Sequence, residues 1–171
     1  KQDGSTIVNT LRLEKQLVNE LECSLLLYYG GRSRSSAKII NEQIKNTQNK
    51  NKKTIEAMHR IKESAYRMKD AVLTGSFPSF AEMLSAAWQE KKKTSSVVSN
   101  RELERTIDYA LANGAKAVKV SGAGGGGMVM IYCEPIDRQK LIDALKQLSG
   151  TTYPVKFSKN GVESWIVEDR A

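Results

Sequence analysis

The segment whose composition departs most from random is a glycine run at residues 122–127. It consists of Gly122, Ala123, Gly124, Gly125, Gly126 and Gly127. Ordering a backbone that lacks side chains costs conformational entropy. Such a segment is useful where its N–H groups must approach an anion closely, or where another backbone must pack against it. A flexible connection between two strands is the alternative, but fewer glycines would suffice for it. The run therefore predicts an active-site loop beside a phosphate group.

The residues that follow the run exclude the common nucleotide-binding motifs. Gly122, Gly124 and Gly127 satisfy the G-x-G-x-x-G pattern of dinucleotide-binding proteins, but that pattern requires a helix directly after it. Residues 128–132, Met-Val-Met-Ile-Tyr, are typical of a strand. No Lys-Ser or Lys-Thr follows the glycines, as a Walker A loop requires. The remaining motifs of protein kinases are absent from the sequence.

A second candidate group is basic and lies at residues 32–36, Arg-Ser-Arg-Ser-Ser. It follows a predicted buried strand and opens a predicted helix. Guanidinium groups and the amides of a helix N-terminus both suit a phosphate. The alternative is a solvated basic loop with serine capping. By contrast, we expect His59 to lie on the surface without a chemical role, and Trp88 to be a packed aromatic residue.

Length, charge and cysteine content exclude several classes of protein. The chain has 171 residues, enough for one domain, and no apolar run approaches the roughly 20 residues that span a bilayer. One histidine and two cysteines, Cys23 and Cys133, are too few for a zinc site, so we expect two buried, reduced thiols. The net charge of +8 would favour a polyanion. The lysine runs at 50–53 and 91–93 carry no interleaved aromatic residues, however, and are expected to be solvated helix ends.

The periodicity of apolar residues predicts an α+β fold with a mostly antiparallel sheet covered by helices on one face. An amphipathic segment at 7–21 and a strand at 23–29 come first. Helices are expected at 37–44, at 55–72 and, from capping boxes at Ser79 and Ser99, at 79–88 and 99–113. Strands at 117–120 and 128–133, a helix at 137–148 and a hairpin of 153–157 with 162–167 complete the order.

Residues 119–127, Lys-Val-Ser-Gly-Ala-Gly-Gly-Gly-Gly, resemble the third signature motif of the GHMP kinases. Four other segments, at 25–36, 41–43, 88–92 and 99–100, resemble the C-terminal half of the bacterial heptose 7-phosphate kinases of that superfamily. The resemblance covers residues 7–167. It implies that residues 7–171 form a GHMP kinase C-terminal domain with a four-stranded antiparallel sheet, and that residues 1–6 are a remnant of the N-terminal domain.

The resemblance also implies an activity and its residues. The parent molecule would transfer the γ-phosphoryl group of ATP to the anomeric hydroxyl of a heptose 7-phosphate. ATP and Mg²⁺ would be held mainly by an N-terminal domain that this sequence lacks, with the glycine run beside the nucleotide. Asp3 would be the catalytic carboxylate, although a frayed polar terminus is the alternative for it. Arg34 and Ser35, with Arg32 behind them, would contact the sugar phosphate.

These expectations have alternatives of a different class. A basic, non-catalytic module that binds RNA or another polyanion would use the net charge, but it leaves the glycine run unexplained. A dimerisation or regulatory domain is a third alternative, and homodimerisation stays open. The sequence opens with neither Met nor a secretory leader, so we expect a cytoplasmic protein with a sugar-phosphate substrate, without membrane or nucleic-acid partners. This chain alone is expected to be inactive.

Overall fold

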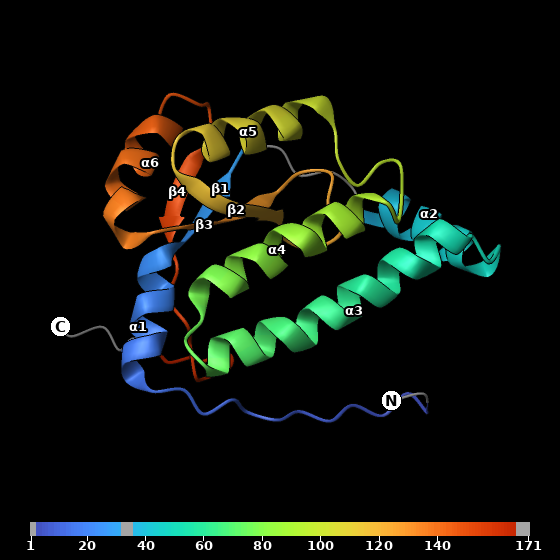
Figure 1. Cartoon of the computed structure of the whole chain (residues 1–171), viewed down its shortest axis with the longest axis horizontal. Helices are drawn as coiled ribbons and strands as arrows, with labels where there is room; N and C mark the ends of the chain where they lie inside the picture. The colour runs from blue at the N-terminus through green and yellow to red at the C-terminus, as the bar shows by residue number, and fades with distance from the viewer. Residues whose placement is uncertain (1–2, 32–35, 167–171) are drawn as a thin grey trace.

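The computed structural model describes residues 3–31 and 36–166 (Figure 1). In chain order the helices are α1 (Lys15–Ser24), α2 (Ser36–Gln48), α3 (Lys52–Leu73), α4 (Phe77–Lys92), α5 (Arg101–Ala112) and α6 (Arg138–Leu145), with a short 3-10 turn at Pro135–Asp137. The strands are β1 (Leu25–Tyr29), β2 (Ala115–Val120), β3 (Met128–Cys133) and β4 (Thr151–Pro154). None of the helices in the described residues is long and apolar enough to cross a membrane.

The four strands form one antiparallel sheet in the order β2-β3-β1-β4. β3 pairs on one side with β2, from which the glycine run leads directly into it, and on the other side with β1. Leu27 of β1 lies opposite both Met130 of β3 and Tyr153 of β4. The predicted α+β class with a four-stranded antiparallel sheet is therefore confirmed.

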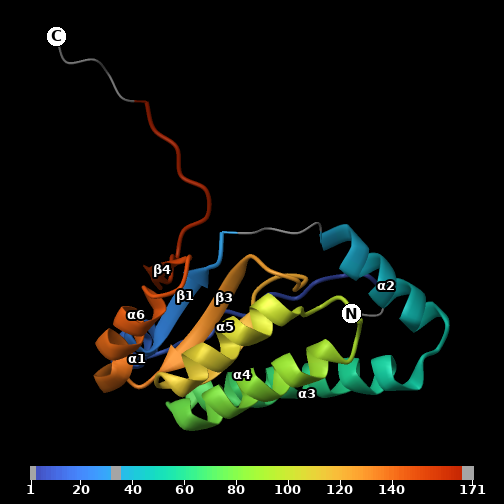
Figure 2. The ribbon, with the colours of Figure 1, turned by 90° about the horizontal axis from the view of Figure 1, so that it is seen from above.

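Helices cover both faces of the sheet, and the expectation of a single covered face is wrong (Figures 1 and 2). Successive strand residues point to opposite faces. Leu26 therefore packs into a core with residues of α5 and α6, whereas Leu25 packs into a second core with residues of α1, α3 and α4. The strands are apolar on both faces because both faces are buried.

The buried line of α3 consists mostly of small residues, namely Thr54, Ala57, Ser64 and Ala71. The spaced apolar residues that predict this helix, from Ile55 to Val72, lie to one side of this line and are mostly half-buried, with Met58 36% exposed. Small side chains at the contact allow two helices to approach closely, and α3 packs beside α4 along its length (Figure 1). Larger side chains therefore lie at the rim of that contact.

The helix starts differ from the predicted capping boxes by a few residues. Ser79 lies inside α4, which begins at Phe77 after the N-cap Ser76. The N-cap of α5 is Asn100, one residue after Ser99. Both serines remain close to a helix start. The capping-box pattern therefore located the start of each helix approximately but did not identify the capping residue.

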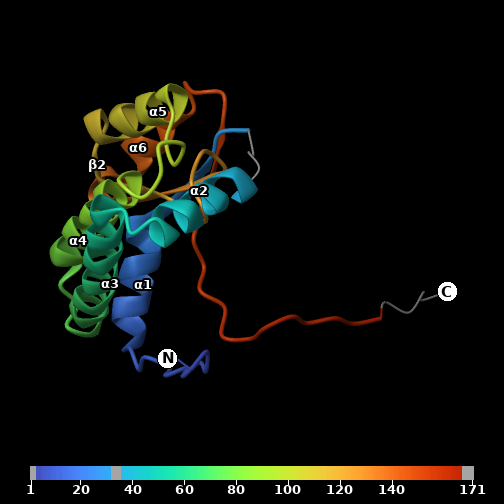
Figure 3. The same ribbon diagram turned by 90° about the vertical axis from the view of Figure 1, so that its right-hand side faces the viewer.

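Both ends of the chain leave the packed body (Figure 3). Residues 5–14 carry no regular structure, so the predicted amphipathic segment becomes helical only from Lys15. The predicted terminal hairpin is wrong, because residues 155–166 form no strand after β4. Trp165 is 79% exposed and Val162 is fully exposed. A returning strand needs a buried face to fix its register, and the described part of the chain offers none here.

Candidate phosphate-binding site

The turn between β2 and β3, residues 122–127, is called the glycine turn below. All five of its glycines have positive φ, from 72° at Gly122 to 145° at Gly126. L-amino acids with a side chain rarely adopt this region, so the backbone path requires glycine along its whole length. The Ser121 amide donates to the Met128 carbonyl at 2.8 Å and closes the turn at its base.

A neighbouring backbone packs directly on the glycine turn. The Gly125 amide donates to the carbonyl of Val98 at 2.6 Å. A Cβ atom added to Gly124 would lie 2.7 Å from the same carbonyl oxygen, closer than real contacts allow. Close approach of another backbone thus explains part of the glycine content, and it fixes the path of the turn.

Asn100 provides a second anchor. Its Oδ1 accepts a hydrogen bond from the Leu103 amide at 3.1 Å and so caps α5. Its Nδ2 donates to the Gly125 carbonyl, also at 3.1 Å. Asparagine suits both tasks because its amide group is donor and acceptor at once. The start of α5 and the glycine turn are therefore held by one side chain.

The segment that carries Val98 is itself tied to α2. Gln43 Nε2 donates to the Thr94 hydroxyl at 2.7 Å, and that hydroxyl donates to the Lys91 carbonyl at 2.7 Å. The Ser96 amide donates to Glu42 Oε1 at 2.7 Å. This bond is the main reason why the pKa of Glu42 lies below its usual value. Because α2 begins at Ser36, these contacts link the glycine turn to the helix that follows residues 32–35.

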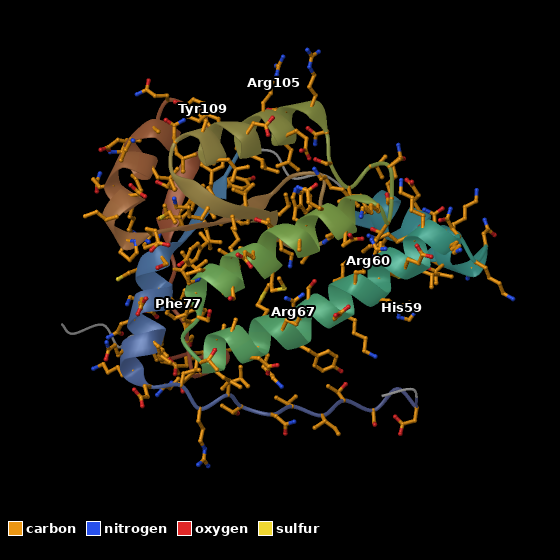
Figure 4. The ribbon with its side chains drawn as sticks, viewed as in Figure 1. His59, Arg60, Arg67, Phe77, Arg105 and Tyr109 are labelled. Atoms are coloured by element: carbon orange, nitrogen blue, oxygen red, sulfur yellow. The ribbon has the colours of Figure 1, made fainter. Side chains whose placement is uncertain are left out.

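A cavity of about 330 Å³ lies beside the glycine turn, between the end of β1 and α5. Its lining includes Tyr28, Gly30, Asn100, Arg105, Tyr109 and Gly126. Arg105 and Tyr109 both come from α5 (Figure 4). The cavity lining combines the rings of Tyr28 and Tyr109, the opposite charges of Arg105 and Glu102, and backbone of the glycine turn with apolar residues.

Of the sequence-predicted substrate and catalytic residues, the structure describes only Asp3. Arg32, Arg34 and Ser35 lie outside the described residues. Asp3 is exposed and accepts a hydrogen bond from the Ser5 amide at 2.8 Å. Its bonds with Ser5 lower the pKa of Asp3. The N-terminal segment runs along the outer side of α3, away from the sheet (Figures 1 and 3).

Three other predictions concern single side chains. His59 is exposed on the outer side of α3, as expected (Figure 4). Trp88 is 1% exposed, which confirms a packed aromatic residue. Cys133 is buried, and burial raises the pKa of its thiol. Cys23 is exposed, contrary to expectation, because it lies at the end of α1 and not in the strand.

The described residues offer phosphate ligands but no carboxylate-rich metal site. Within residues 3–31 and 36–166, no three His, Cys, Asp or Glu side chains are grouped so that they could hold a metal ion. The glycine turn, Lys91 and Lys119 instead supply backbone and ammonium groups, which suit phosphate oxygens. The lysine run at 91–93 is predicted to be a solvated helix end, but Lys91 is half-buried. The sequence predicts no functional role for Val98 or Asn100. The only sequence signal for Lys91 and Asn100 is that they lie in segments that resemble the family, at 88–92 and 99–100.

Comparison with known proteins agrees with this geometry. The family model of the GHMP kinase C-terminal domain matches residues 68–149. A D-glycero-alpha-D-manno-heptose 7-phosphate kinase from Campylobacter jejuni is 39% identical over 94% of this chain and 47% of that protein. The structure of a D-glycero-D-manno-heptose 1-phosphate kinase from Bacteroides thetaiotaomicron has 31% identity and a TM-score of 0.65, covering 95% of this chain and 42% of the other.

A mevalonate kinase from L. major has a TM-score of 0.65 at 23% identity, covering 72% of this chain and 38% of that one, and shares the fold. The four-stranded antiparallel sheet with its helices is thus a fold that this chain shares with these kinases. Residues 68–149 match the C-terminal domain of the GHMP kinases, and the chain as a whole is similar to the heptose-phosphate kinases. It spans about half the length of the curated relative from C. jejuni. These phosphotransferase relatives do not support the alternative of an RNA-binding module.

Proposed function

We propose that this chain is the C-terminal half of an ATP-dependent kinase that acts on a heptose 7-phosphate. The observation that carries the proposal is the 39% identity to the C. jejuni enzyme along 94% of the chain. The anchored glycine turn supports it as a phosphate-proximal element. In this proposal residues 7–171 form the C-terminal domain and residues 1–6 belong to the preceding domain. The partners would be that domain and the sugar phosphate, and the reaction would take place in the cytoplasm.

The proposed reaction is a single phosphoryl transfer. The anomeric oxygen of the sugar forms a bond to the γ-phosphorus of ATP, the bond from that phosphorus to the β,γ-bridging oxygen breaks, and ADP leaves. The proton of the anomeric hydroxyl passes to a carboxylate, for which Asp3 is our candidate. The preceding domain would have to carry Asp3 to the glycine turn, because the segment that holds it lies beside α3 here. Mg²⁺, held mainly by the preceding domain, would neutralise phosphate charge. Positioning and charge neutralisation would supply most of the catalysis.

The chain's own residues would hold the reactants in place. We propose that residues 122–127 line the nucleotide phosphates and that Arg34 and Ser35, with Arg32, contact the phosphate of the sugar. The contacts from α2 to residues 94–96 support this arrangement, since they connect the helix after residues 32–35 to the support of the glycine turn. Nucleotide phosphate and sugar phosphate would then be held by one connected frame.

The test is a kinase assay of the intact protein that contains this chain, with MgATP and heptose 7-phosphate, and with ³¹P NMR to identify an anomeric phosphate. Gly125 has a φ of +76° and is buried, so Gly125→Val should nearly abolish turnover. Full activity of that variant would contradict the role of the glycine turn. Arg34→Ala should raise the KM for the sugar phosphate more than that for ATP. Arg67→Ala, at an exposed site on α3, is the matched control.

A further inference from the structure

The three consecutive lysines at the end of α4 have different surroundings. Lys92 pairs with Glu104 at 3.1 Å, and Lys93 pairs with Glu90 at 2.6 Å. Lys91 has no carboxylate partner among the described residues. A lysine on a solvated helix end is normally exposed to water or paired with a carboxylate. Lys91 is half-buried instead, without such a pair in the described part of the chain.

Lys91 points to the glycine turn. It is half-buried in the last turn of α4, and its Nζ donates to the carbonyl of Gly122. Burial and the nearby charge of Lys119 together lower the pKa of Lys91. The Gly122 carbonyl satisfies only one of the three N–H groups that an ammonium ion carries. The other donors are available to a ligand at the start of the glycine turn.

Lys119 reaches the same place from the sheet. Its neighbours Val118 and Val120 belong to the core under α5 and α6, whereas Ala117 belongs to the core under α4. Because side chains alternate along a strand, Lys119 lies on the α4 face. It is half-buried, three residues before Gly122, and has no ion-pair partner in the described part of the chain. Two half-buried cations therefore share one face of the turn.

We propose that Lys91 and Lys119, together with the start of the glycine turn, form a binding site for a phosphoryl group. Like charges held together away from full solvation are unfavourable, and a bound anion converts that repulsion into attraction. The site lies on the α4 side of the turn, whereas the cavity lined by Arg105 lies on the α5 side. The inference rests on the proposed function only for its ligand, which is the polyphosphate of ATP or the phosphate of the sugar.

The first experiment measures lysine reactivity in the intact protein by brief acetylation and mass spectrometry. ATP and heptose 7-phosphate are added separately, each without the other, so that no turnover is needed. We expect one of them to slow acetylation of Lys91 and Lys119 at least severalfold while Lys93 is unaffected. The ligand that protects identifies the source of the phosphoryl group. Equal reactivity with and without both ligands would overturn the proposal.

The second experiment compares dissociation constants of variants by calorimetry. Lys119→Met should weaken binding of the protecting ligand about tenfold, the effect of one charged hydrogen bond. Lys93→Met removes the same charge from a lysine paired with Glu90 and should change binding less than about twofold. Equal losses in the two variants would show a general charge effect and refute the site. Binding that depends on Lys119 without turnover of heptose 7-phosphate would instead refute the proposed function alone.

Discussion

Asn100 Nδ2 lies 3.1 Å from the carbonyl oxygen of Gly125 and donates a hydrogen bond to it. The same side chain caps α5 through Oδ1. A ligand that moves the backbone of the glycine turn would therefore also move the start of α5, which lines the adjacent cavity. The turn is thus held as part of the domain's frame, a requirement for a phosphate site that must not reorganise during reaction.

Variants of Asn100 can separate capping from turn positioning. Asn100→Asp keeps an acceptor for the Leu103 amide but loses the donor to Gly125, whereas Asn100→Ala loses both. We expect Asn100→Ala to lower the free energy of unfolding by about 1 kcal/mol, and Asn100→Asp to change it much less. Hydrogen exchange in residues 122–127 should accelerate in both variants. Unchanged exchange in Asn100→Asp would show that the contact with Gly125 does not hold the turn.

Two glycines of the same turn should respond differently to alanine. Gly124 has a φ of +110° and no space for a Cβ beside Val98, whereas Gly122 has a φ of +72° and open space. Gly124→Ala should destabilise the protein by about 2–4 kcal/mol, from backbone strain plus the clash. Gly122→Ala carries the strain alone and should cost about 1 kcal/mol. Urea unfolding measures both, and equal losses would refute the close approach of Val98.

Arg138 joins α6 to the junction between α1 and β1. Its guanidinium Nη1 donates to the carbonyls of Cys23 and Leu25, the latter at 2.8 Å. Arg138→Met keeps much of the aliphatic stem but leaves these carbonyls without the donor. We expect a loss of about 1–3 kcal/mol in the free energy of unfolding. Arg138→Lys should recover part of it, and no recovery would argue for a packing role instead.

The C-terminal segment is attached to the body through a titratable group. Lys156 and the Phe157 amide both donate to the carboxylate of Glu22, and Lys156 is the main reason why the pKa of Glu22 lies below 4.5. A lowered pKa means that the attachment is complete above about pH 4.5 and is lost as the pH falls further. Limited proteolysis of residues 155–166 should therefore accelerate in acid.

Glu22→Gln provides the control for that titration. It cannot titrate and lacks the charge, so cleavage of residues 155–166 should be fast already at pH 7 and independent of acid. If the wild-type protein shows no acceleration between pH 5 and pH 3 ahead of global unfolding, Glu22 does not control the segment.

The two thiols should differ in reactivity. Cys23 is exposed, whereas Cys133 is buried and its thiol has a raised pKa. A thiol-specific reagent should modify a single cysteine in the folded protein at pH 8 and both after unfolding. Peptide mapping should identify Cys23 as the fast site. Rapid modification of Cys133 would contradict the buried position of β3.

Local patterns were sufficient to find most elements of this fold. β3 matches its predicted bounds, and the glycine run was correctly placed between two strands. Sequence patterns predicted burial less well where packing against another helix or strand decides which side chains are covered. The spacing of Ile55 and Met58 predicts an apolar stripe on α3, but the close contact with α4 buries Ala57 and Ser64. The predicted terminal hairpin failed because Val162 and Trp165 have no described surface to cover.

The sequence by itself determined the glycine turn, since a backbone path with positive φ at five positions can be built only from residues without a side chain. Apart from the C-terminal hairpin, it also determined the strand and helix order, which follows from short-range periodicity. Only the tertiary structure decided which side chains hold the turn. Lys91, Val98 and Asn100 lie 25 to 31 residues from their partners in the hydrogen bonds to Gly122 and Gly125, and such contacts depend on how α4, β2 and α5 pack. Their spacing along the chain carries no periodic signal, because long-range contacts are set by packing and not by local geometry.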